Sequence, residues 1–163
     1  MLQTMNAPLV TVMLLSASIA LGQTNASKAS TVVWKADLKQ STFGPGPQPK
    51  SLTLNIIKDT PDAIEFRVDV VDATGKSDSY SWGGPVDGTL QPLKNAAGQV
   101  IGRESLKRDG DALLRHGEDP SDGSSFDSRS TTSADGKTMT DVITIRSKDG
   151  KTSKMTTVFH RSN

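Results

Sequence analysis

The sequence contains no cysteine, and this absence excludes two kinds of stabilisation and anchoring. No disulfide framework can form, and no lipobox cysteine can carry a lipid anchor. The stability of the folded chain must therefore come from a hydrophobic core and from backbone pairing.

Charged residues are missing from positions 1–27, although they make up 23% of the whole chain. An apolar run occupies residues 9–21, and residues 20–22 supply the small side chains that a signal peptidase reads. Three polar residues interrupt the run, which is shorter than the ~20 apolar residues of a membrane-spanning helix. The pattern predicts a signal peptide over residues 1–22 and disfavours the alternative, a membrane anchor.

Cleavage before Gln23 is the first expectation, and cleavage after Ala26 is the second. Residues 23–30 would then form a flexible N-terminal segment, and residues 31–163 the folded domain. The predicted localisation is exported, either periplasmic or extracellular, with no integral membrane span after cleavage. Small secreted animal domains usually carry disulfides, so the missing cysteine favours a bacterial exported protein.

The sequence also lacks a large excess of charge of either sign, because 19 Lys and Arg residues nearly balance 18 Asp and Glu residues, for a net charge of +1. Positive and negative residues are interspersed along the chain, as on a solvated surface. This balance argues against nucleic acid or an anionic membrane as a partner.

Helical periodicity is absent beyond position 30, whereas the two-residue alternation of β-strands recurs. Residues 62–72 carry the strongest strand pattern, with Ile64, Phe66, Val68 and Val70 on one face and charged residues on the other. Further alternating runs lie at 52–57, 80–82, 138–145 and 154–159.

Glycine-containing turns at 73–76, 134–137 and 148–151 each join two alternating runs. Such hairpin turns need a positive φ that glycine accepts without strain, and successive hairpins make neighbouring strands antiparallel. The spacing predicts an all-β fold, an antiparallel up-and-down β-barrel of about eight to ten strands. The alternative is a β-sandwich, but a regular meander leaves two exposed edges unless it closes.

The supply of apolar residues is low for such a barrel, because only 41 of the 141 residues after position 22 are apolar. A dense hydrophobic filling would be hard to build. The barrel is therefore either small and partly open, or has an interior lined partly by polar groups around water or a ligand.

No catalytic motif is present. Gly-Lys-Ser and Gly-Lys-Thr triplets occur in three turns, but each lacks the upstream glycine of a phosphate-binding loop. No Gly-x-Ser-x-Gly elbow exists, so the sequence predicts no catalytic residues, no cofactor and a protein that is not an enzyme.

Metal-binding patterns are weak. His116 and His160 lie far apart, and neither has a second histidine at ligand spacing. Residues 118–127 are rich in oxygen-bearing side chains but lack the ordered spacing of an EF-hand loop, which favours a solvated loop over a calcium site. We predict no metal site.

Two segments near the start of the domain carry a resemblance to a known family. Residues 32–35 read Val-Val-Trp-Lys, and residues 41–51 contain Phe-Gly-Pro-Gly-Pro-Gln-Pro-Lys-Ser. Together with an Asp-Gly-Thr turn at 87–89 and residues 133–140, they resemble small exported bacterial lipocalin-like, or calycin-type, proteins. The resemblance implies an antiparallel barrel with a ligand cavity, and it supplies no catalytic residues.

The sequence therefore predicts a binding protein that holds a small hydrophobic or amphipathic molecule inside the barrel. Aromatic and apolar residues of two alternating runs, Phe66, Val68, Tyr80 and Trp82, are the candidate ligand-binding residues. The alternative is an envelope or extracellular interaction module with a filled barrel that acts through loops such as 83–99. A cofactor-independent enzyme is the least favoured class.

Overall fold

The protein is described by a computed structural model, which covers residues 31–44 and 46–162. The predicted signal peptide and the segment 23–30 lie outside the described residues. Ten strands make up the described part: β1 (Val32–Ala36), β2 (Ser51–Asp59), β3 (Ala63–Val71), β4 (Ser77–Pro85), β5 (Gln91–Asn95), β6 (Val100–Asp109), β7 (Ala112–Asp119), β8 (Ser124–Thr132), β9 (Thr138–Arg146) and β10 (Thr152–Ser162).

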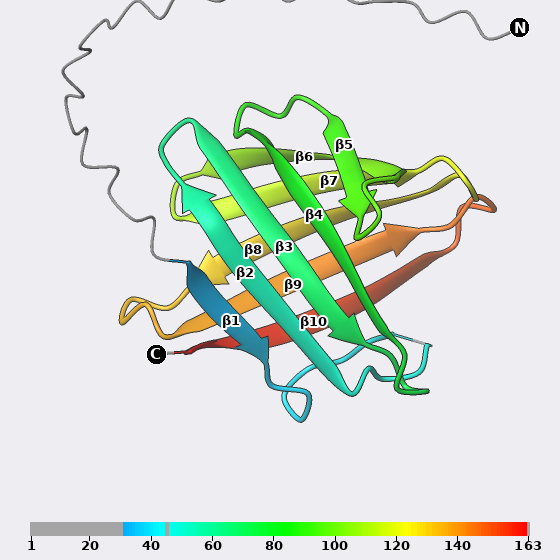
Figure 1. Ribbon diagram of the computed structural model, residues 1–163, viewed down its shortest axis with the longest axis horizontal. Coiled ribbons are helices and arrows are strands. Elements are labelled where there is room, and N and C mark those ends of the chain that lie inside the picture. The colour runs from blue at the N-terminus through cyan, green and yellow to red at the C-terminus, as the bar shows by residue number, and fades with distance from the viewer. Residues whose placement is uncertain (1–30, 45, 163) are drawn as a thin grey trace, which may run out of the picture.

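The strands form one closed antiparallel barrel in which each strand pairs with its neighbours in sequence (Figure 1). Pairing of β1 with β10 closes it, with Trp34 opposite Arg161 and Ala36 opposite Phe159. The predicted up-and-down barrel of eight to ten strands is confirmed, and the sandwich alternative is not the fold observed. Among the described residues no helix is long and apolar enough to span a membrane.

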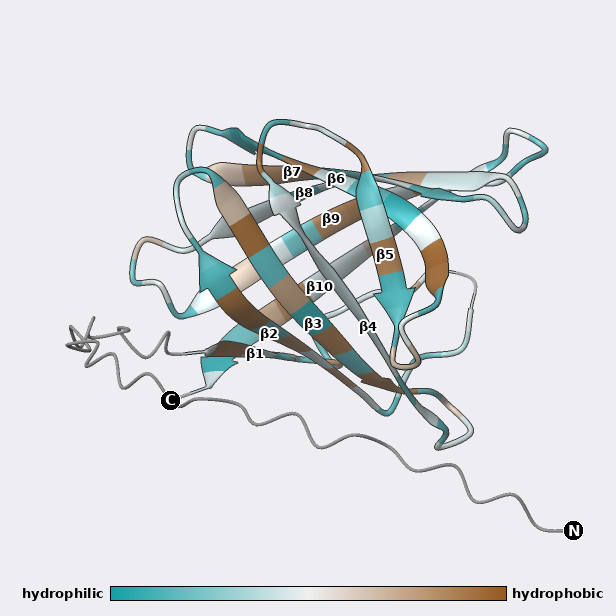
Figure 2. Ribbon diagram, turned by 45° about the horizontal axis from the view of Figure 1, so that its top comes forward, coloured by the Kyte–Doolittle hydropathy of each residue, from teal (hydrophilic) through white to brown (hydrophobic). Residues whose placement is uncertain are grey.

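The structure shows the alternation of buried and exposed side chains that the sequence predicted for β3. Ile64, Phe66 and Val68 are buried, whereas Glu65 and Arg67 between them are exposed. Figure 2 shows the same alternation of hydrophobic and hydrophilic residues along β2 and β3. Because side chains of a strand alternate between two faces, this pattern places one face inside the barrel and the other in solvent.

The three predicted hairpin turns depend on glycine as expected. Gly75, Gly136 and Gly150 have φ values of 100°, 68° and 81°. In the first turn the carboxylate of Asp72 also accepts hydrogen bonds from the backbone N–H groups of residues 74–76. These turns fix the register of the strands they join.

A hydrophobic cluster fills one region of the interior. Ile64, Phe66 and Val68 of β3 pack there with Trp82 of β4 and Leu106 of β6. The rings of Phe66 and Trp82 are stacked, with centroids 5.8 Å apart and an angle of 20° between planes. The cluster ties the first half of the barrel to its middle strands.

A close approach on β7 requires glycine at position 117. A Cβ atom at Gly117 would lie 2.1 Å from the ring of Phe126, which is its cross-strand partner on β8. The ring therefore lies across the bare backbone of Gly117, and the guanidinium of Arg115 lies over that ring at 5.4 Å from its centroid. Gly117 thus positions a side chain of the barrel interior.

Gly117→Ala should lower the free energy of unfolding by about 1–3 kcal/mol, because the Phe126 ring must move to admit the methyl group. Denaturant unfolding of both proteins measures the change. Gly46→Ala is the matched control, since an added Cβ there meets no atom within 4 Å. Equal losses in the two variants would contradict the role assigned to the close approach.

Candidate ligand cavity

The barrel encloses a cavity of about 400 Å³. This volume lies within the ~300–1,000 Å³ of small-molecule sites. Its lining comes from β2, β3, β4, β6, β7, β8, β9, β10 and the segments beside them, and consists of Phe43, Pro47, Pro49, Leu52, Leu54, Ile56, Ile64, Phe66, Val68, Val70, Asp72, Ala73, Tyr80, Leu106, Leu113, Arg115, Ser130, Met139, Asp141, Ile143, Met155, Thr157 and Phe159.

Most of this lining is apolar, and alternate positions of β2, β3, β9 and β10 supply much of it. On β9 and β10 the lining residues Met139, Ile143, Met155 and Phe159 all occupy the same inward register. The cavity therefore follows directly from the two-residue period of the sequence. An apolar body of a ligand would be desolvated against these walls.

The segment 37–50, between β1 and β2, contributes Phe43, Pro47 and Pro49 to the cavity wall. It contains the proline-rich stretch on which the family resemblance depended. Because Phe43, Pro47 and Pro49 reach the cavity, the described residues of this segment form part of its boundary rather than a remote surface loop.

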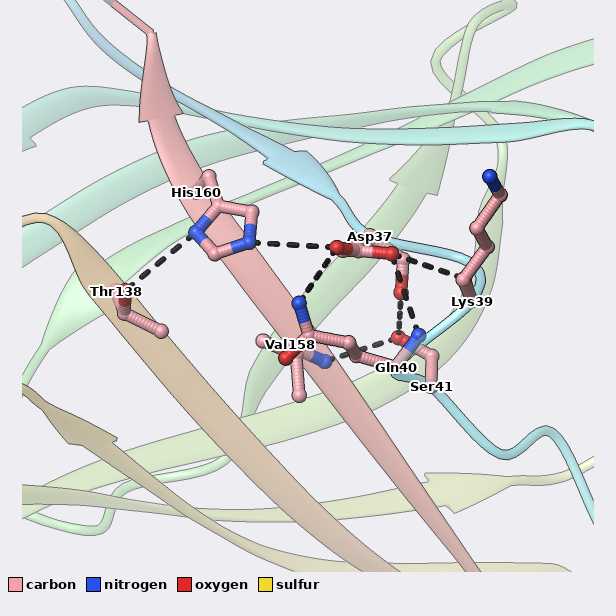
Figure 3. Close-up of polar contacts among 7 residues, drawn as sticks. All are labelled: Asp37, Lys39, Gln40, Ser41, Thr138, Val158 and His160. Atoms are coloured by element: carbon pink, nitrogen blue, oxygen red, sulfur yellow. Dashed lines mark hydrogen bonds and ion pairs between the residues drawn. The ribbon is translucent and has the colours of Figure 1, made fainter.

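Hydrogen bonds fasten the start of this segment to β10 (Figure 3). The backbone N–H of Asp37 donates to the carbonyl of Val158 at 2.7 Å. The Ser41 hydroxyl donates to the carbonyl of Asp37 and accepts from the N–H of Val158, at 2.6 and 3.0 Å. Thr42 and Thr156 exchange two backbone hydrogen bonds. The boundary of the cavity is thus held by the strand that closes the barrel.

A buried polar cluster interrupts the apolar wall. Arg115 of β7 lies between two carboxylates: its Nη2 donates to Asp141 on β9 at 3.1 Å, and its Nη1 lies 3.3 Å from Oε1 of Glu104 on β6. Its Nε donates to the Ser128 hydroxyl at 3.1 Å, and Ser130 donates to the other oxygen of Asp141. Four consecutive strands, β6 to β9, therefore meet in one cluster.

Glu104 is the most buried member, with 1% of its surface exposed. Its Oε1 has no hydrogen-bond partner among the described residues, because the contact with Arg115 lacks the alignment of a hydrogen bond. Burial raises the pKa of Glu104, and the positive charge of Arg115 opposes that rise. Its backbone carbonyl accepts the indole N–H of Trp82 at 2.8 Å.

Tyr80 of β4 brings a phenol to the same region. Burial raises the pKa of Tyr80 to about 12, with smaller effects from Arg115, Glu104 and Asp141. The phenol therefore stays neutral at physiological pH, and its hydroxyl serves as both donor and acceptor toward the cavity.

The structure brings three of the four predicted ligand-binding residues to the cavity. Phe66, Val68 and Tyr80 line it. Trp82 does not: its ring packs behind Phe66, and its N–H is already bonded to the Glu104 carbonyl. Trp82 thus supports the wall and the polar cluster, and ligand binding by the four residues stays a prediction.

Comparison with known proteins shows the fold. No family model matches the sequence, and no curated protein matches it significantly. Among solved structures, a mutant of the fluorescent protein UnaG superposes with a TM-score of 0.54 at 10% identity, covering 83% of this chain and 98% of that one. Wild-type UnaG gives a TM-score of 0.50 at 11% identity, covering 80% and 95%. The likeness is one of fold alone, a closed antiparallel up-and-down β-barrel.

The histidines and the acidic loop lie away from the cavity. His116 contacts Asp127 and Glu118 on the exposed side of the barrel, and His160 lies 3.5 Å from Asp37. The prediction of a loop over 118–127 is wrong in part, because β7 runs to Asp119 and β8 begins at Ser124, so that only residues 120–123 form a turn. The carboxylates of Asp119 and Asp122 accept hydrogen bonds from residues of this turn and from Ser124. Within residues 31–44 and 46–162, no group of three metal-ligating side chains could hold an ion.

Sequence reasoning missed the polar cluster. Its signal is a charged residue placed on the apolar register of a strand: Asp141 between Met139 and Ile143, and Arg115 two residues after Leu113. In the sequence each such residue is a single interruption of the apolar alternation. The pairing of β6 to β9 shows that the interrupting residues of these strands are neighbours in the barrel.

Tyr80 is the single tyrosine of the chain, so its ionisation can be followed directly by tyrosinate absorbance. We expect a midpoint near pH 12 in the folded protein and near the ordinary value of 10 in denaturant. Because the folded pKa is the higher one, the phenol contributes stability that is present below pH 10 and is lost as the pH rises toward 12. A folded-state midpoint near 10 would contradict the buried placement.

Proposed function

We propose that this protein binds a small, partly apolar molecule in the barrel cavity. The observation that carries the proposal is the cavity itself, about 400 Å³ of interior space with apolar walls and a few convergent polar groups. A barrel that only served as a scaffold for its loops would gain stability by filling this space, because packed side chains stabilise a core more than a void does.

The arrangement of the polar groups supports the same reading. Arg115, Asp141, Ser130 and Tyr80 all border the cavity, and they lie on four different strands. Small-molecule sites typically combine an apolar wall with a small number of polar groups that orient the ligand. The nearest approach to a catalytic pair is Ser130, whose hydroxyl donates to Asp141, but that carboxylate also accepts from Arg115, and we therefore favour binding over catalysis.

Export is a further part of the proposal. The uncharged first 27 residues, with their apolar run and small residues at 20–22, support a signal peptide that is removed before Gln23. A bacterial origin and a periplasmic or extracellular location fit the missing cysteine. A protein isolated from its host with residues 1–22 still attached would contradict export by this route.

Binding can be tested with a neutral solvatochromic dye whose emission rises in an apolar environment. Ile143→Trp should weaken dye binding at least about tenfold, because the larger ring occupies the cavity that Ile143 lines. Fluorescence titration of the folded variants measures the affinity, and circular dichroism checks that they are folded.

Val142→Trp is the matched control, since Val142 is the neighbouring residue on β9 and 43% of its surface is exposed on the outer face. It should bind the dye like the parent protein. Equal binding by Ile143→Trp and the parent would place the dye outside the cavity. Failure of the parent protein to bind would reject the proposed function and favour the interaction module.

A further inference from the structure

The cavity contains a charged cluster whose composition restricts the ligand further. Resting on the proposed function, we propose that the cavity selects molecules whose polar end donates hydrogen bonds, as a hydroxyl or an ammonium group does, and discriminates against carboxylates. Two properties of the cluster restrict the ligand: its net charge and the hydrogen-bonding groups that it leaves open.

Arg115 already has two carboxylates beside its guanidinium, so an incoming anion would be the third. Its guanidinium donates to Asp141 through Nη2 and to Ser128 through Nε, and Nη1 lies beside Glu104. One face of the group covers the ring of Phe126. Two of the five guanidinium N–H groups are engaged in these hydrogen bonds, and a further carboxylate at the remaining N–H groups would stand beside Glu104 and Asp141, whose negative charge opposes it.

The net charge of the cluster also disfavours a bound carboxylate. With both acids ionised, Arg115, Glu104 and Asp141 sum to −1; with Glu104 protonated, as its burial favours, they sum to zero. Asp72 also lines the cavity, and Arg115 is the only lysine or arginine among the described lining residues. Neither protonation state leaves positive charge for an anion, so a bound carboxylate would add uncompensated negative charge in a poorly solvated interior.

Hydrogen-bond acceptors, in contrast, remain open. An ionised carboxylate accepts at about four positions. Asp141 uses one oxygen for Ser130 and the other for Arg115, so its carboxylate can accept further hydrogen bonds. Tyr80 also lines the cavity, and its neutral hydroxyl can accept a hydrogen bond as well. A ligand head that donates hydrogen bonds therefore meets groups able to receive them.

Competition between three probes of one chain length tests the proposal: 1-decanol, decylamine and decanoate, each displacing the neutral dye from the full mature protein at pH 7. We expect decanol or decylamine to displace the dye at a concentration at least about tenfold lower than decanoate does. The order of the first two distinguishes a hydroxyl from an ammonium head.

The outcomes separate this inference from the binding function. Dye binding with decanoate as the best competitor, or with no difference among the three probes, would overturn the inference and leave cavity binding intact. Absence of dye binding would reject both.

A charge-removing variant should change the preference. Asp141→Asn frees Arg115 from one carboxylate at nearly constant volume, so decanoate should gain at least about tenfold in affinity and decylamine should lose. Glu104→Gln provides the same test from the other side of Arg115, should Asp141→Asn not fold.

Asp69→Asn is the matched control, because Asp69 pairs with Arg67 outside the cavity and its side chain is 39% exposed. An unchanged order of probes in a folded cluster variant would overturn the assignment.

Discussion

Closure of the sheet by β1 and β10 is the constraint on which the interior depends. Without that pairing, β1 and β10 would be exposed edges, and the alternating inward residues would face no enclosed space. The same strand β10 also receives Asp37, Ser41 and Thr42 from the segment after β1. Strand β10 therefore both closes the barrel and holds the segment that borders the cavity.

The interior that results is divided between a packed part and an open part. Phe66 stacks on Trp82 and packs with Leu106, and Phe66 and Leu106 also form one wall of the cavity. The apolar residues of β9 and β10 face the same unfilled volume from the other strands. The low apolar content of the chain accounts for this division, since there are too few large side chains to fill a ten-stranded barrel. The buried cluster around Arg115 occupies part of the remaining space and brings polarity to it.

Much of the fold could be predicted from short-range sequence patterns, because strand alternation and glycine turns are local properties. β3 and the turns at Gly75, Gly136 and Gly150 are examples. The cavity lining was predicted for Phe66, Val68 and Tyr80, which lie on strong alternating runs. Trp82 shares their face, but its distance from the cavity depends on packing. The Arg115 cluster depends on the register of the four strands β6 to β9, which their connecting turns set together.

Native mass spectrometry of the mature protein, purified from its own host, tests ligand binding most directly. The native and denatured masses of one preparation are compared. We predict a discrete additional mass in the native spectrum that is lost on denaturation, from a neutral or amine-bearing amphipathic molecule. A bare native mass, together with failure of the neutral dye to bind the purified protein, would contradict the account.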